Sequence, residues 1–373
     1  ASVDRPYAEA SRRARERARF WIAQFERRRD PALADLIGFL RRIQADPLAA
    51  MAEAEAKRFP GLQRLAALLA AAPAPQAQYE AADRGEAGRV LEPQPALSKT
   101  ESRWRAVFPQ TKPNLTATQH GIAGMWEEPG RWLDFLEHHA LAWQSFDVLD
   151  DLAMAVDALH AMGAGATVLD PLLERGAALL EINLGAAAAG GGTLQWGWLE
   201  NRPALRMLAH RAYRAAAAMD RGARSERFVA LAERLIALNS GDNHFVREPL
   251  TRAYLASGRP EKVLTLTDRY PDDFCGPTLN RILALVRLGR RGDALVALRD
   301  AGKDHGVAVE MLLSNAPKRP KSDGAFGITV GGKEEAWDYR GAHRALWEQD
   351  GALEWLRAAW GEIRKSVRRG LQK

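Results

Sequence analysis

The feature that most constrains the fold is a short internal repeat in the second half of the chain. Segment 255–264 (LASGRPEKVL) aligns with segment 286–295 (VRLGRRGDAL), and a looser copy ends at Gly222. The glycines of the three copies are Gly222, Gly258 and Gly289, so the copies are 36 and 31 residues apart. Each copy has the pattern of a helix, a glycine turn and a second helix. One helical hairpin leaves its apolar face uncovered, so the pattern predicts hairpins stacked side by side.

The rest of the chain after residue 130 has the same helical character. Helical segments are separated by Gly, Pro, Asp, Asn or Ser, which end and begin helices. No segment shows sustained alternation of apolar and polar residues, so we expect an all-α protein. The expected helices are 131–146, 147–162, 168–184, 203–219, 225–238, 243–256, 260–269, 278–288, 293–301, 333–347 and 352–369.

The N-terminal third has a different organisation. Residues 1–72 are rich in Ala, Leu, Arg and Glu, which are good helix formers. Residues 73–115 contain prolines and glycines spread along their length, which predicts a linker with at most one helical turn near Trp104. We therefore expect a basic N-terminal helical module (1–72), a proline-rich linker (73–115) and a helical repeat domain (116–373).

Charge is concentrated at the two ends of the chain. The 53 basic and 47 acidic residues give a net charge of +6. Residues 1–29 contain nine arginines against four acidic residues, and residues 362–373 contain five basic residues against one glutamate. The long middle of the chain is therefore slightly acidic. Such basic ends are typical of solvated helix surfaces, but they also permit binding to nucleic acid or an anionic membrane.

Patterns for metal, nucleotide and thiol chemistry are weak. Segment 327–333 (GITVGGK) has the spacing of a phosphate-binding loop, but Glu334 stands where the motif requires Ser or Thr. The eight histidines show no ligand spacing, and no base can be assigned to Cys275. We therefore predict no catalytic residues, no metal and no cofactor. A single cysteine and the absence of a 20-residue apolar run favour a cytoplasmic protein.

Several segments together carry a resemblance to a known family. They are 198–206 (WLENRPALR), 238–247 (LNSGDNHFVR), 269–273 (RYPDD), 332–339 (GKEEAWDY) and 351–356 (GALEWL). In this order they resemble bacterial tetratricopeptide-like proteins related to the suppressor-of-tumorigenicity group. The resemblance covers residues 168–357 and departs from the family at Ala204 and Ser240. It implies a tetratricopeptide-like (TPR-like) helical solenoid that acts as a scaffold, and it implies no reaction.

The main functional hypothesis is a non-enzymatic adaptor that binds a protein or peptide on the concave face of the stacked hairpins. The candidate contact residues are on the first helices of the pairs: Arg206, Tyr213, Arg247 and Tyr254.

Two other hypotheses stay open. In the first, the basic ends bind nucleic acid or an anionic membrane. Its candidate residues are Arg12, Arg13, Arg19, Arg368 and Arg369. In the second, the chain is an enzyme with an active site between helices, which a pocket lined by perturbed acids or histidines would favour.

Overall fold

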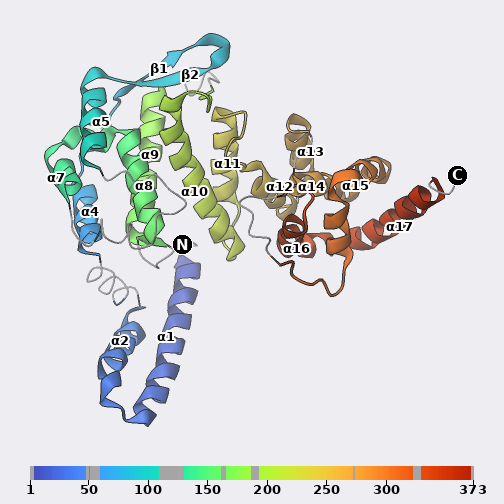
Figure 1. Ribbon diagram of the computed structural model, residues 1–373, viewed down its shortest axis with the longest axis horizontal. Helices are drawn as coiled ribbons and strands as arrows, with labels where there is room; N and C mark the ends of the chain where they lie inside the picture. Colours follow the sequence, from blue (N-terminus) through green and yellow to red (C-terminus); the bar gives the residue numbers. More distant parts are fainter. Residues whose placement is uncertain are drawn as a thin grey trace. The chain divides into compact units, whose positions relative to one another are not determined.

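The computed structural model describes residues 4–47, 50, 59–108, 126, 130–160, 165–185, 193–271, 274–321 and 329–370. Within these residues the chain is mostly helical, as the sequence predicted (Figure 1). The chain divides into two compact units. The first contains residues 1–224 and 233–244, and the second contains residues 225–232 and 245–373. The division falls within helix α11 (Glu226–Leu238), which therefore contributes to both.

The first unit begins with a helical hairpin. Helix α1 (Asp4–Arg28) packs against α2 (Ala34–Ala45), and a short 3₁₀ turn (Pro31–Leu33) connects them. The side chain of Asp30 accepts a hydrogen bond from the backbone N–H of Ala32 at 2.9 Å. Proline at the first position and an Asp cap are common helix-start signals, and the sequence showed both here.

Segment 73–108 is more ordered than the linker that its prolines predicted. Strands β1 (Tyr79–Asp83) and β2 (Arg89–Pro93) form an antiparallel hairpin with Tyr79 opposite Pro93, and helix α5 (Pro95–Val107) follows. Two distant asparagines hold the hairpin. The Oδ1 atom of Asn183 accepts from the backbone N–H of Tyr79 at 2.7 Å, and that of Asn201 accepts from Leu91 at 3.0 Å. The fold is therefore mostly α, with this two-stranded sheet added to it.

An aromatic cluster forms one part of the core of the first unit. Trp104 of α5 stacks on Phe108 with 4.6 Å between ring centroids, and Trp132 lies edge-on to Trp126 at 5.3 Å. Trp104, Trp126 and Trp132 are fully buried. These tryptophans therefore pack between elements of the first unit.

The other helices of the first unit surround this core. Helix α10 contacts both α8 and α9, and α4 contacts α7 and α9. Their bounds are α4 (Pro60–Ala70), α7 (Arg131–His138), a 3₁₀ segment (Ala140–Gln144), α8 (Phe146–His160), α9 (Ala166–Leu184), a second 3₁₀ turn (Leu199–Asn201) and α10 (Arg202–Asp220).

In the described residues of the second unit, helices are the only regular secondary structure. Consecutive helices pack on one another from α12 to α16, and α14 also contacts α12, α16 and α17. The elements are α12 (Arg247–Ala256), α13 (Pro260–Arg269), α14 (Cys275–Arg287), α15 (Arg291–Leu313), α16 (Lys333–Trp347) and α17 (Ala352–Gly370). A buried hydrogen-bond network crosses this unit, because Asn280 of α14 donates to Thr251 Oγ1 at 2.9 Å and accepts from Tyr339 Oη at 3.2 Å.

The three repeated glycine turns have the same backbone structure. Gly222, Gly258 and Gly289 have φ values of 96°, 68° and 74°, in the left-handed region that glycine adopts without strain. In each turn, the residue after the glycine donates its N–H to a carbonyl five residues earlier, as in Arg259 N to Tyr254 O at 2.8 Å. This is a helix C-terminus of the Schellman type. The repeat in the sequence therefore corresponds to a repeated turn between helices.

Candidate functional site

The polar face of α10 is the best-formed candidate site. Arg202, Arg206, His210 and Tyr213 are spaced by four, four and three residues, which places them on one side of the helix. We call these four residues the α10 face. The opposite side of α10 carries buried residues such as Ala204 and Leu208, which anchor the helix in the unit.

Arg206 is held in place by a buried carboxylate. Its Nε and Nη2 atoms both donate to Oδ2 of Asp150 on α8, at 2.8 and 2.5 Å. The side chain of Asp150 is 5% exposed, whereas that of Arg206 is 40% exposed. Burial raises the pKa of Asp150 to about 6, and the hydrogen bond and charge of Arg206 oppose this rise. The pair is therefore ionised at neutral pH, and it fixes a guanidinium at the surface.

Tyr213 and His244 lie at the other end of the same face. The hydroxyl of Tyr213 donates to the backbone carbonyl of His244 at 2.6 Å. The ring of His244 is edge-on to Trp196 at 4.6 Å, and the Arg202 guanidinium lies 5.0 Å from the Trp196 centroid. Both ring nitrogens of His244 are without a hydrogen-bond partner among the described residues. Burial, with a smaller effect of Arg206, lowers the pKa of His244 to about 4, so the ring is neutral at pH 7.

A second group of ionisable residues lies where α5 meets α8. Glu101 Oε1 accepts from the hydroxyls of Tyr79 at 2.7 Å and Ser145 at 2.8 Å, and Asp151 accepts from Trp104 Nε1 at 2.8 Å. Burial raises the pKa values of Glu101 and Asp151. Each of these carboxylates therefore accepts a hydrogen bond that joins α5 or α8 to its neighbours. Among the described residues, no group of His, Cys, Asp and Glu has the geometry to hold a metal ion.

The sequence-predicted contact residues do not all lie in one unit. Arg206 and Tyr213 belong to the first unit, and Arg247 and Tyr254 belong to the second. The Arg247 guanidinium lies 3.9 Å from the centroid of the Phe245 ring. Tyr254 is buried, and Arg259 and Lys262 lie over its ring.

The basic residues at the ends have different settings. Arg12, Arg13 and Arg19 are exposed on α1, and Arg12 pairs with Glu16 at 3.6 Å. Arg368 and Arg369 belong to α17, but their side chains lie outside the part of the chain that the structure describes.

The carboxylate of Glu335 lies beside the backbone of segment 327–333, which resembles a phosphate-binding loop. Lys333 begins α16, and Glu335 Oε2 accepts from the N–H of Gly331 at 2.7 Å. Residues 327 and 328 of the motif lie outside the described residues. The other oxygen of Glu335 accepts from the N–H of Cys275 at 2.8 Å. Burial, with the nearby Glu335 and Glu248, raises the pKa of the Cys275 thiol.

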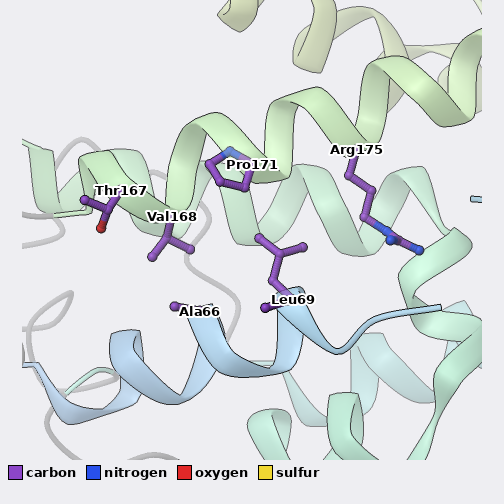
Figure 2. Close-up of a pocket in the computed structure, with 7 residues that line it drawn as sticks. Ala66, Leu69, Thr167, Val168, Pro171 and Arg175 are labelled. Atoms are coloured by element: carbon purple, nitrogen blue, oxygen red, sulfur yellow. The ribbon is translucent and has the colours of Figure 1, made fainter. Parts of the chain in front are cut away.

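A shallow groove between α4 and α9 has a volume of about 260 Å³ (Figure 2). Its one charged residue, Arg175, donates to the backbone carbonyls of Trp143 and Pro73, each at 2.7 Å. These bonds hold the chain that leaves α4, so the arginine has a structural role. The groove is lined by Ala66, Leu69, Ala70, Thr167, Val168, Pro171 and Arg175.

Sequence reasoning named Arg206 and Tyr213 as candidates but did not identify the residues that contact them. Asp150 and His244 lie 56 and 31 residues from these side chains, so no local pattern connects them. One signal was available: Arg202 and His210 precede and follow Arg206 by one helical turn. Another signal was the acidic pair Asp150–Asp151, which stands between apolar residues of α8. An acidic residue in such a position is expected to be buried and therefore to need a partner.

No protein-family model, no curated protein and no solved structure matches this chain. In the described part of the chain, no helix is both long and apolar enough to cross a membrane.

Proposed function

We propose that the protein is a non-enzymatic helical adaptor that binds a carboxylate-bearing peptide segment of a partner protein on the α10 face. The observation that carries the proposal is the Arg206–Asp150 pair. It holds a guanidinium at the surface through two donors that share one carboxylate oxygen. The remaining N–H groups of Arg206 have no acceptor among the described residues, so they are available to a carboxylate or carbonyl of a partner.

The surroundings of Arg206 favour a peptide ligand. Tyr213 is 42% exposed, and its hydrogen bond to the His244 carbonyl limits its movement. Tyrosine and arginine side chains that hydrogen bonds already hold in place lose little conformational entropy on binding. Both residue types are also common among the residues that contribute most of the binding energy at interfaces. The aromatic ring of Trp196, with Arg202 beside it, adds an apolar surface with a cationic edge.

We also propose the class of protein to which the chain belongs. The repeated glycine turns and the packing of consecutive helices from α12 to α16 support a TPR-like solenoid related to the family that the sequence resembles. Proteins of this architecture commonly present a long surface for extended peptides.

The proposal is tested by selecting peptides from a displayed random library against the full chain. We expect enrichment of peptides that carry Asp, Glu or a C-terminal carboxylate. Arg206→Gln should weaken binding of a selected peptide by about tenfold to a hundredfold, the range of a charged hydrogen bond.

A matched substitution separates this face from general electrostatics. Arg211 is on the opposite side of α10 and also pairs with a carboxylate, that of Glu174. Arg211→Gln should leave the affinity of the selected peptide unchanged. Equal losses in the two variants, or a selection without any acidic preference, would refute the α10 face as the binding site. Circular dichroism of both variants checks that the helices remain folded.

A further inference from the structure

The exposed side of α1 has a combination of side chains that the adaptor proposal does not use. Phe20 is 56% exposed and Trp21 is 47% exposed, and both lie in a helix rich in arginine. Arg13, Arg17, Phe20, Gln24 and Arg27 are spaced by four, three, four and three residues, so they form one stripe along the helix. We call these five residues the α1 stripe.

The stripe is on the side of α1 that faces away from α2. Ala18 and Ile22, which are buried, mark the side that packs in the hairpin. Glu26, on that same side, forms an ion pair with Arg41 of α2 at 2.8 Å. By contrast, Arg13, Arg17 and Arg27 are all exposed together with Phe20. The hairpin therefore covers the small apolar side of α1 and leaves its arginine-rich side in solvent.

Charge on the exposed side of α1 is strongly positive. Between Ser11 and Arg28 the chain contains seven arginines and two glutamates. Both glutamates are paired with arginines, Glu16 with Arg12 and Glu26 with Arg41. These two carboxylates are therefore engaged with arginines outside the stripe, and with seven arginines against two glutamates in this part of the helix the surface is complementary to a polyanion.

The aromatic rings indicate which polyanion fits. Phe20 is within the α1 stripe. The ring of Trp21 lies edge-on to the ring of Phe20, with 5.3 Å between centroids, and stacks on the ring of Phe25, with 5.5 Å between centroids. A membrane-surface helix instead keeps its aromatic residues on an apolar face opposite the charges. Phe20, an exposed ring between arginines, is suited to stack on an unpaired base while the arginines bind phosphates.

We propose that the α1 stripe binds single-stranded nucleic acid. Arg13, Arg17 and Arg27 contact the phosphates, and Phe20, supported by Trp21, stacks on a base. The stripe is about 21 Å long from Arg13 to Arg27 at the rise of an α-helix, which is enough for several nucleotides. It reads no base edge, so binding is tolerant of sequence.

The first test measures fluorescence anisotropy of a labelled oligothymidylate of about 16 nucleotides with the full chain. Three phosphate contacts predict that log K falls with log salt with a slope of about −2. Phe20→Leu keeps an apolar side chain but removes the ring, and it should weaken binding by about fivefold or more. An unchanged affinity for Phe20→Leu would overturn the proposal.

A matched pair of arginine variants tests the stripe itself. Arg15 and Arg17 are both exposed, but two residues separate them by about 200° around the helix, so Arg15 is outside the stripe. Arg17→Gln should make the salt slope less negative by about 0.7, and Arg15→Gln should change it less. Equal changes would show that only net charge acts.

Three further probes distinguish the possible ligands. Polyuridylate should bind about as well as the oligothymidylate, whereas the same length of duplex DNA should bind more weakly because its bases are not free to stack. Vesicles of phosphatidylcholine and phosphatidylserine should compete poorly. Preferential binding to the vesicles, or no binding to any single strand at low salt, would contradict the proposal.

Discussion

At the scale of residues, the Arg206–Asp150 pair is the central element of the candidate site. A buried carboxylate is costly unless it is paired, and here both donors of one guanidinium edge reach the same oxygen. The arrangement keeps an exposed arginine in one conformation. The same pair links α8 to α10, so the geometry of the surface depends on the packing beneath it.

The raised pKa of Asp150, about 6 in the fold, predicts a pH effect on stability. Between pH 4 and 6 the folded state holds a proton that the unfolded chain has released. The free energy of unfolding should therefore contain a contribution that is present below about pH 4 and is lost as the pH rises through 6. Its size is up to about 3 kcal/mol. Asp150→Asn does not ionise, so this fall should be absent from the variant.

Urea denaturation of both proteins at several pH values between 4 and 7 measures the effect. Asp170→Asn is a matched control, because Asp170 pairs with Arg214 on the surface, where an ion pair contributes little. The interpretation of Asp150 fails if the wild type and Asp150→Asn lose stability in parallel over this range.

At the scale of elements, the glycine turns show how a local pattern becomes a repeated structure. Gly258 and Gly289 both have positive φ, and a Cβ atom built at either would meet nothing within 4 Å. Only the backbone conformation therefore requires glycine there. This separates the conformational role of these residues from any steric one.

Replacement by alanine tests this role. Gly258→Ala and Gly289→Ala should each reduce the free energy of unfolding by about 1 kcal/mol, the cost of a left-handed conformation with a Cβ. Gly292 is in the first turn of α15, has no positive φ and has the same empty surroundings. Gly292→Ala should therefore be neutral or stabilising in the same thermal or urea denaturation. A loss equal to that of the turn variants would contradict this interpretation.

The turns were predictable from the sequence, but the β-hairpin was not. Helix ends depend on residues within a few positions, so a glycine after a helical segment was sufficient to place them. Strands β1 and β2 contain three acidic residues and little apolar alternation, and β2 begins with an arginine and ends with a proline. Their order depends on Asn183 and Asn201, which lie about a hundred residues away in sequence. Such contacts leave no local signal.

At the scale of the whole molecule, both of the surfaces that we propose belong to the first unit. The first unit contains both the α10 face and the α1 stripe, and the second contains most of the repeated hairpins. An adaptor with one surface for a peptide and another for a nucleic acid would bring the two ligands together. Of the four contact residues predicted from the sequence, Arg206 and Tyr213 belong to the α10 face, whereas Arg247 and Tyr254 belong to the second unit.

Site-specific photocrosslinking tests the central claim, that the α10 face is where a partner binds. The crosslinker p-benzoylphenylalanine replaces Tyr213 in one protein and Ile182 of α9 in another, since the two side chains are 42% and 43% exposed in the same unit. Both proteins are irradiated in the cells from which the chain comes. We predict a discrete adduct from position 213, which is lost when Arg206→Gln is added, and none from position 182. Equal adducts at the two positions, or an adduct at 213 that survives Arg206→Gln, would contradict the account.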